Sequence, residues 1–114
     1  MTASALETTL AALADPTRRG VIDLLRREPR RAGEIASAFG MTAPAMSRHL
    51  RVLRRSGLVE EQSLDDDARV RVYRLRREPF AELRSWIDEI ESFWTLQLDS
   101  FKKHAERTRK KRSQ

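Results

Sequence analysis

The chain contains no cysteine among its 114 residues, which excludes disulfide bonds, zinc fingers and thiolate sites that sense metals or redox state. It also contains no apolar run near the roughly 18 residues that a membrane-spanning helix requires. The N-terminal sequence MTASALETTL has neither the basic segment nor the apolar segment of an export signal. We therefore expect a cytoplasmic protein that does not span a membrane.

Groups that could support catalysis or bind a metal are equally scarce. The chain has four glycines and no glycine-rich loop after a strand, and its only histidines are His49 and His104. Ser47 stands near His49 in sequence, but neighbouring positions on a helix do not face each other, so the two do not form a nucleophile and its base. A second histidine one turn from His104 is missing, although carboxylates lie on the same segment at Asp88, Glu89, Glu91 and Asp99. We predict no enzyme activity, no metal site and no cofactor.

Basic residues are abundant. Lysine and arginine number 23 against 17 aspartate and glutamate, so the net charge is +6 and the pI is about 10.7. Nucleic acid is the commonest partner of a small basic domain, and an anionic membrane surface would also fit this charge. The length predicts one domain, which we place at residues 1–106, followed by a basic and disordered tail at residues 107–114.

The stretch Met41–Gly57 predicts a helix with clear start and stop signals. Thr42 can cap its first turn, Pro44 is tolerated there, and Gly57 can adopt the left-handed conformation that ends a helix. Apolar residues recur on one side at Met46, Leu50 and Leu53. The other side carries small side chains and then arginines, which is what a helix in the DNA major groove requires. A cationic helix face is more often only solvated, so the interpretation depends on the segments around it.

The preceding segments predict three short helices. The first covers about Ser4–Ala14, and the second begins after Asp15, which can act as its N-cap, and ends before Pro29. The third covers about Ala32–Phe39 and lacks an obvious N-cap residue. Gly40 then leads directly into the Met41–Gly57 helix, and two helices joined by such a short turn are typical of a helix-turn-helix.

Two arginines stand in the first turn of the second helix, where cations oppose the helix dipole. We expect an anionic group to compensate Arg18 and Arg19. Asp15 or Asp23 is the simpler candidate, and a DNA phosphate is the alternative.

The pattern changes to an alternation of apolar and polar residues after Gly57. Extended segments are expected at Leu58–Ser63 and Arg69–Leu75, joined by a polar turn at Leu64–Ala68. Such a hairpin after a recognition helix would form a wing with a basic outer face at Arg69 and Arg71. The three carboxylates of Asp65–Asp67 would repel phosphates, so we expect the tip to point away from DNA or toward a positive patch of the protein.

A long final helix is expected from Glu78 to about Glu106. Its apolar stripe contains five of the seven aromatic residues, more than a small domain can cover by itself. The same helix, or the first helix, of a second subunit would cover this surface, and packing on its own domain is the alternative. We predict a dimer interface that contains Leu6, Leu10, Ile87, Ile90, Trp94 and Phe101.

Several motifs together resemble the ArsR family of bacterial winged-helix repressors. They are LADPTRRGVIDLL, GEIASAF, the segment Met41–Val59 with Ser47-Arg48-His49-Leu50 inside it, and RVRVYRL. The resemblance implies a mainly helical winged helix-turn-helix fold with one β-hairpin, in the order of four helices, two strands and one helix. It also implies a homodimer formed by the first and last helices, which binds double-stranded DNA and represses transcription. The predicted DNA-binding residues are Thr42, Ala43, Pro44, Ser47, Arg48, His49, Arg51, Arg55, Arg69 and Arg71.

The chain also departs from the family pattern. Its third helix reads Glu34-Ile35-Ala36-Ser37-Ala38, without the thiols that metal-sensing members carry there, and the usual glycine at the wing tip is missing. Two alternatives stay open. One is a repressor that responds to a small apolar effector held by the last helices under Trp86 and Trp94. The other is a winged helix that binds protein or RNA.

Overall fold

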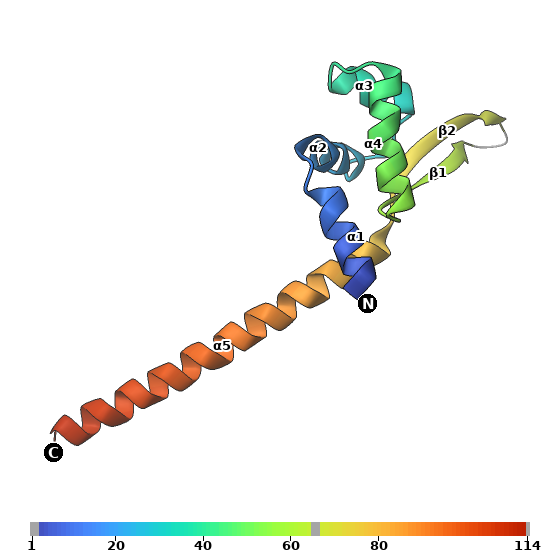
Figure 1. Cartoon of the computed structure of the whole chain (residues 1–114). Helices are drawn as coiled ribbons and strands as arrows, with labels where there is room; N and C mark the ends of the chain where they lie inside the picture. The colour runs from blue at the N-terminus through green and yellow to red at the C-terminus, as the bar shows by residue number, and fades with distance from the viewer. Residues whose placement is uncertain (1–2, 65–66, 114) are drawn as a thin grey trace. The chain divides into compact units, whose positions relative to one another are not determined.

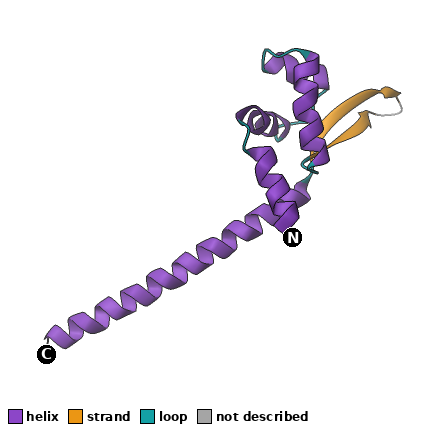
Figure 2. Cartoon of the chain, in the orientation of Figure 1, coloured by secondary structure: helices purple, strands orange, loops and turns teal. Residues whose placement is uncertain are grey.

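The computed structural model describes residues 3–64 and 67–113 and has the predicted winged helix-turn-helix fold (Figure 1). Helices dominate, and the two strands form one antiparallel hairpin (Figure 2). The chain divides into two compact units, Met1–Glu82 and Leu83–Gln114. No helix in the described ranges is both long and apolar enough to cross a membrane. The elements are α1 (Ala3–Leu13), α2 (Pro16–Leu25), α3 (Ala32–Ala38), α4 (Ala43–Arg55), β1 (Val59–Leu64), β2 (Asp67–Leu75) and α5 (Arg77–Ser113).

Helix α4 begins and ends where its sequence predicts. The Thr42 hydroxyl accepts a hydrogen bond from the Ala45 N–H group at 3.3 Å, which satisfies one free donor of the first turn. At the other end Gly57 adopts φ 77°, and the Leu58 N–H group donates to the Leu53 carbonyl at 3.0 Å. This is a Schellman motif, in which the left-handed glycine lets the backbone turn away from the helix axis. The recognition helix is therefore held at both ends by local interactions.

The turn between α3 and α4 is built in the same way. Gly40 has φ 61°, and the Met41 N–H group donates to the Ala36 carbonyl at 3.0 Å. The start of α3 differs from the expectation, since the Arg31 N–H group donates to the Glu34 carboxylate at 3.1 Å. Glu34 thus caps a helix that has no serine, threonine, aspartate or asparagine before it.

The core of the first unit is formed by apolar side chains from α1 to α4 and from the start of β1. Its fully buried members include Val21 of α2, Ile35 of α3 and Leu53 of α4. Ala12 contributes from α1, and Val59 from β1. Because each element buries at least one side chain here, the core fixes α4 against the other helices and the base of the hairpin.

The hairpin pairs Val59 with Leu75 at its base and continues to the Ser63–Arg71 pair, after which the register shifts. Val72 is buried and Arg71 is exposed, so the predicted alternation of the second strand is confirmed. The strand begins at Asp67, earlier than the predicted Arg69, because Asp67 pairs with Leu64 beyond the shift. The predicted turn includes residues 65 and 66, which lie outside the described residues, and so does that part of the expectation for the acidic tip.

Helix α5 continues well past its predicted end. It runs to Ser113, so the end predicted near Glu106 is wrong and residues 107–113 belong to the helix. The segment contains no glycine or proline after Pro79, and its many lysine, arginine and glutamate residues are good helix formers. Cations near a helix C-terminus are also favourable for the helix dipole.

Candidate nucleic-acid interface

Helix α4 separates a buried face from a cationic outer face. Met46, Leu50 and Leu53 are at most 2% exposed and attach the helix to the core. The opposite side is exposed, as the 3.6-residue repeat requires, and it begins with small side chains and continues with three arginines. The exposed residues of this outer face are Ala43, Pro44, Ser47, Arg48, Arg51 and Arg55.

The arginines of the outer face have no ionic partner among the residues whose placement is described. In the part of the chain that the structure describes, Arg48, Arg51 and Arg55 form no ion pair and no side-chain hydrogen bond. Arg54, on the flank of the same helix, behaves differently because its Nη1 lies 3.0 Å from the Glu61 carboxylate. The outer face thus presents three guanidinium groups to solvent, which is an arrangement suited to an extended polyanion.

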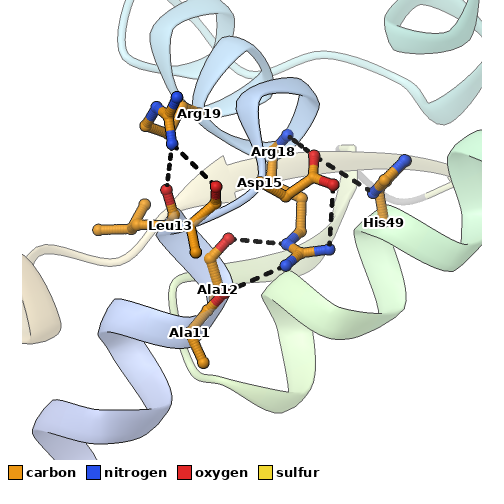
Figure 3. Close-up of polar contacts among 8 residues, drawn as sticks. Ala11, Ala12, Leu13, Asp15, Arg18, Arg19 and His49 are labelled. Carbon is orange, nitrogen blue, oxygen red and sulfur yellow. Dashed lines mark hydrogen bonds and ion pairs between the residues drawn. The ribbon is translucent and has the colours of Figure 1, made fainter.

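Arg18 and Arg19 bind the end of α1 (Figure 3). Arg18 Nε donates to the Ala12 carbonyl at 2.7 Å, and Arg19 Nη1 donates to the Leu13 carbonyl at 2.8 Å. These carbonyls are the unpaired acceptors of the last turn of α1, and cations are favourable at that end of a helix. Arg18 also lies 3.9 Å from Asp15, as one of the two sequence hypotheses expected.

His49 of α4 turns toward the loop before α2 (Figure 3). It is half-buried, and its Nδ1 lies 4.0 Å from Oδ1 of Asp15. Asp15 is also the N-cap of α2 and accepts from the Arg18 N–H group at 3.1 Å. That hydrogen bond, helped by the charges of Arg18 and His49, lowers the pKa of Asp15 against the opposing effect of desolvation. His49 therefore lies apart from the outer face, although it was predicted together with it.

The wing carries a polar cluster that the sequence analysis did not identify. Glu61 of β1 accepts from the Tyr73 hydroxyl at 2.5 Å, from Arg71 Nη1 at 3.0 Å and from Arg54 Nη1 at 3.0 Å. The Tyr73 hydrogen bond, followed by the two arginines, lowers the pKa of Glu61. Burial and the same hydrogen bond raise the pKa of Tyr73 to about 12. Of the two predicted wing arginines, Arg71 belongs to this cluster, and Arg69 is exposed on β2.

Helix α5 exposes many large apolar side chains in the single chain. Trp94 is 60% exposed and Phe101 is 72% exposed. The rings of Phe93 and Trp94 contact each other in an edge-to-face arrangement. Of the predicted interface residues in α1, Leu10 is exposed and Leu6 is half-buried. The exposed large apolar residues of α5 are Trp86, Ile87, Ile90, Phe93, Trp94, Leu96, Leu98 and Phe101.

Among the side chains that the structure describes, no group of three or more histidine, aspartate or glutamate residues could hold a metal ion together. His104, the histidine with carboxylates nearby in sequence, is exposed on α5.

Comparison with known proteins finds similarity to helix-turn-helix domains and to a transcriptional regulator. A helix-turn-helix domain family matches residues 13–62. The HTH-type transcriptional regulator Rv2034 of Mycobacterium tuberculosis is 37% identical over 90 residues, which cover 79% of this chain and 78% of that protein.

The solved structures that resemble this chain also include transcriptional regulators and DNA-binding domains. The crystal structure of an ArsR family transcriptional regulator, RHA00566, superposes with a TM-score of 0.73 at 33% identity and covers 83% of this chain and 95% of its own. A homodimeric winged helix-turn-helix DNA-binding domain from Mycobacterium bovis, a possible ArsR-family regulator, superposes with a TM-score of 0.61 at 28% identity. That match covers 78% of this chain and 80% of the other.

Proposed function

Because the chain belongs to the ArsR family of winged helix-turn-helix transcriptional regulators, we propose that it is a homodimeric repressor that binds an inverted-repeat operator. Members of the family regulate transcription by binding DNA, so the protein is not an enzyme.

The observation that carries the proposal is the outer face of α4. Its small residues at Ala43 and Ser47 would let the helix backbone approach the floor of the major groove. Arg48, in the second turn, would reach a base edge, where guanidinium groups form bidentate hydrogen bonds with guanine. Arg51 and Arg55, further along, would contact phosphates and hold the helix in register. The lack of ion pairs at these three arginines among the described residues supports the assignment.

Other predicted contacts take more specific roles in this proposal. Thr42 caps α4, and Pro44 belongs to the exposed face. His49 would support the position of α4 through Asp15 instead of reading a base, because its side chain is half-buried. Arg69 of the wing would contact the flanking phosphates.

The proposed dimer follows from the exposed apolar side chains and from the homodimeric relative in Mycobacterium bovis. Ile87, Ile90, Trp94 and Phe101 are between 39% and 72% exposed in one chain, and contiguous apolar surface on this scale usually marks an interaction site. Together with Leu6 and Leu10 of α1, they would form a two-fold interface. A two-fold dimer presents two copies of α4, which matches half-sites one helical turn apart, at roughly 34–36 Å.

Footprinting on the DNA upstream of the protein's own coding region tests this proposal. The wild-type dimer should protect two half-sites about one helical turn apart at about 150 mM salt in the presence of random competitor DNA. Arg48→Ala should lose this protection at the same protein concentration. Arg84→Ala is the matched control, because it also removes one exposed arginine, which lies on α5. A wild-type protein that protects no repeat under these conditions would contradict the proposed function.

A further inference from the structure

Glu61 occupies an unusual position between the recognition helix and the wing. Its side chain is 19% exposed, and it receives hydrogen bonds from the last turn of α4 and from two positions of β2. The strand register places Tyr73 directly opposite Glu61, and Arg71 lies diagonally on the same face. One carboxylate therefore joins three elements, α4, β1 and β2, which are all labelled in Figure 1.

We propose that Glu61 is a specificity-determining positioning residue, which fixes the wing relative to α4 and withholds the guanidinium groups of Arg54 and Arg71 from DNA. The inference rests on the proposed DNA-binding function of α4. The contacts of Glu61 divide the arginines of α4 and its neighbour Arg71 into two classes. Arg48, Arg51 and Arg55 are available for DNA, whereas Arg54 and Arg71 are held by the protein.

The charges explain why the carboxylate matters. Two guanidinium groups that share one carboxylate carry a net charge of +1 as a set, and the carboxylate offsets their mutual repulsion. Replacing the carboxylate by a neutral amide leaves both cations without their partner, and DNA phosphates then become the alternative. Non-specific DNA affinity and its salt dependence follow the number of phosphates that the protein neutralises. Specific affinity depends in addition on the geometry of α4 and the wing, which the same change loosens.

Glu61→Gln should therefore increase binding to a random-sequence duplex while weakening discrimination. The plot of log affinity against log salt for random duplex should become steeper by about one to two units, since each additional phosphate contact contributes about 0.9. The affinity ratio between the footprinted operator duplex and random duplex should fall by about tenfold or more. Glutamine keeps an acceptor for the Tyr73 hydroxyl, and circular dichroism would confirm that the variant is folded.

Glu60→Gln is the matched control for this experiment. It makes the same change of charge at the neighbouring position of β1, where the carboxylate is half exposed and lies 3.9 Å from Arg74. Because neighbouring strand residues point to opposite faces, Glu60 does not share the Glu61 cluster. We expect Glu60→Gln to change the salt slope by less than one unit and to leave the affinity ratio within about threefold.

Arg54→Gln supplies a second, independent arm. In the wild-type background it should leave the slope for random duplex unchanged, because Arg54 is held by Glu61. In the Glu61→Gln background the same substitution should lower the slope by about one unit. Equal effects of Glu61→Gln and Glu60→Gln would overturn the inference. A shallower slope in Glu61→Gln would overturn it too, since that result would mean that Glu61 presents the two arginines to DNA. A wild-type protein without preference for an operator would count against the proposed function, and the slopes on random duplex would still test Glu61.

Discussion

Truncation of Trp94 should dissociate the dimer while each winged helix stays folded. The side chain is 60% exposed in the single chain. It belongs to the unit Leu83–Gln114, whereas the buried core residues belong to the unit Met1–Glu82. A fully buried tryptophan removes about 200 Å² from water, so the exposed share is about 120 Å². At about 25 cal/mol per Å², covering this area contributes about 3 kcal/mol in each subunit. Two symmetric copies contribute about 6 kcal/mol, and every 1.4 kcal/mol changes a dissociation constant about tenfold.

Sedimentation equilibrium on Trp94→Ala is the assay, combined with circular dichroism to follow the helical content. The dissociation constant of the dimer should rise by several powers of ten, and binding to the inverted repeat should be lost at physiological salt even though Arg48 is intact. Leu96→Ala is the control. Leu96 is 67% exposed and lies about 200° around the helix from Trp94, so its truncation should leave the dimer intact. A Trp94→Ala protein that stays dimeric and binds the operator normally, or one that unfolds completely, would refute this reasoning.

Three further predictions concern the DNA interface, metals and pH. Arg48→Ala should make the free energy of operator binding less favourable by about 1–3 kcal/mol and relax specificity at one base pair. Arg69→Ala should weaken binding to all sequences alike and make the slope of log affinity against log salt shallower by about one unit. Quantitative binding to a panel of operator variants would measure both effects. Zinc, cadmium, nickel and arsenite should leave the DNA affinity unchanged, because the chain has no cysteine and the described residues contain no group of three or more histidine, aspartate or glutamate side chains that could hold an ion. Calorimetric detection of stoichiometric binding at micromolar affinity would contradict this. Tyr73, the single tyrosine, should ionise near pH 12 in an ultraviolet absorbance titration, because burial and Glu61 raise its pKa to about 12. Since the pKa is raised in the folded state, this contribution to stability is complete below about pH 10 and is lost as the pH rises through about 12. A midpoint near 10 would contradict both the burial of Tyr73 and its hydrogen bond to Glu61.

Features set by local chemistry were predictable from the sequence. The caps at Asp15 and Thr42 and the left-handed Gly57 depend on side chains and backbone within about five residues, and all three are present. The apolar spacing of α4 likewise predicted its buried face, because a helix repeats every 3.6 residues whatever surrounds it.

Features that depend on tertiary geometry were not predictable in this way. The contact of Arg18 with the carbonyls of α1 depends on the angle between α1 and α2, which no local pattern reports. The Glu61 cluster depends on the hairpin register, and the register shift between Ser63 and Leu64 moves the pairing near the tip. The turn of His49 toward Asp15 depends on how α4 packs on the loop before α2. In the proposal for Glu61, the contacts of that carboxylate decide whether Arg54 and Arg71 are available to DNA.

The central claim is that two copies of α4, held by one dimer, bind two half-sites of an inverted repeat. The most direct test is to insert about five base pairs, half a helical turn, between the half-sites of the footprinted operator and to measure the affinity at about 150 mM salt. The insertion turns one half-site to the opposite side of the duplex, so the account predicts that affinity falls to the level of random duplex. Undiminished binding to the altered operator would show that the half-sites are bound independently, and it would contradict the account.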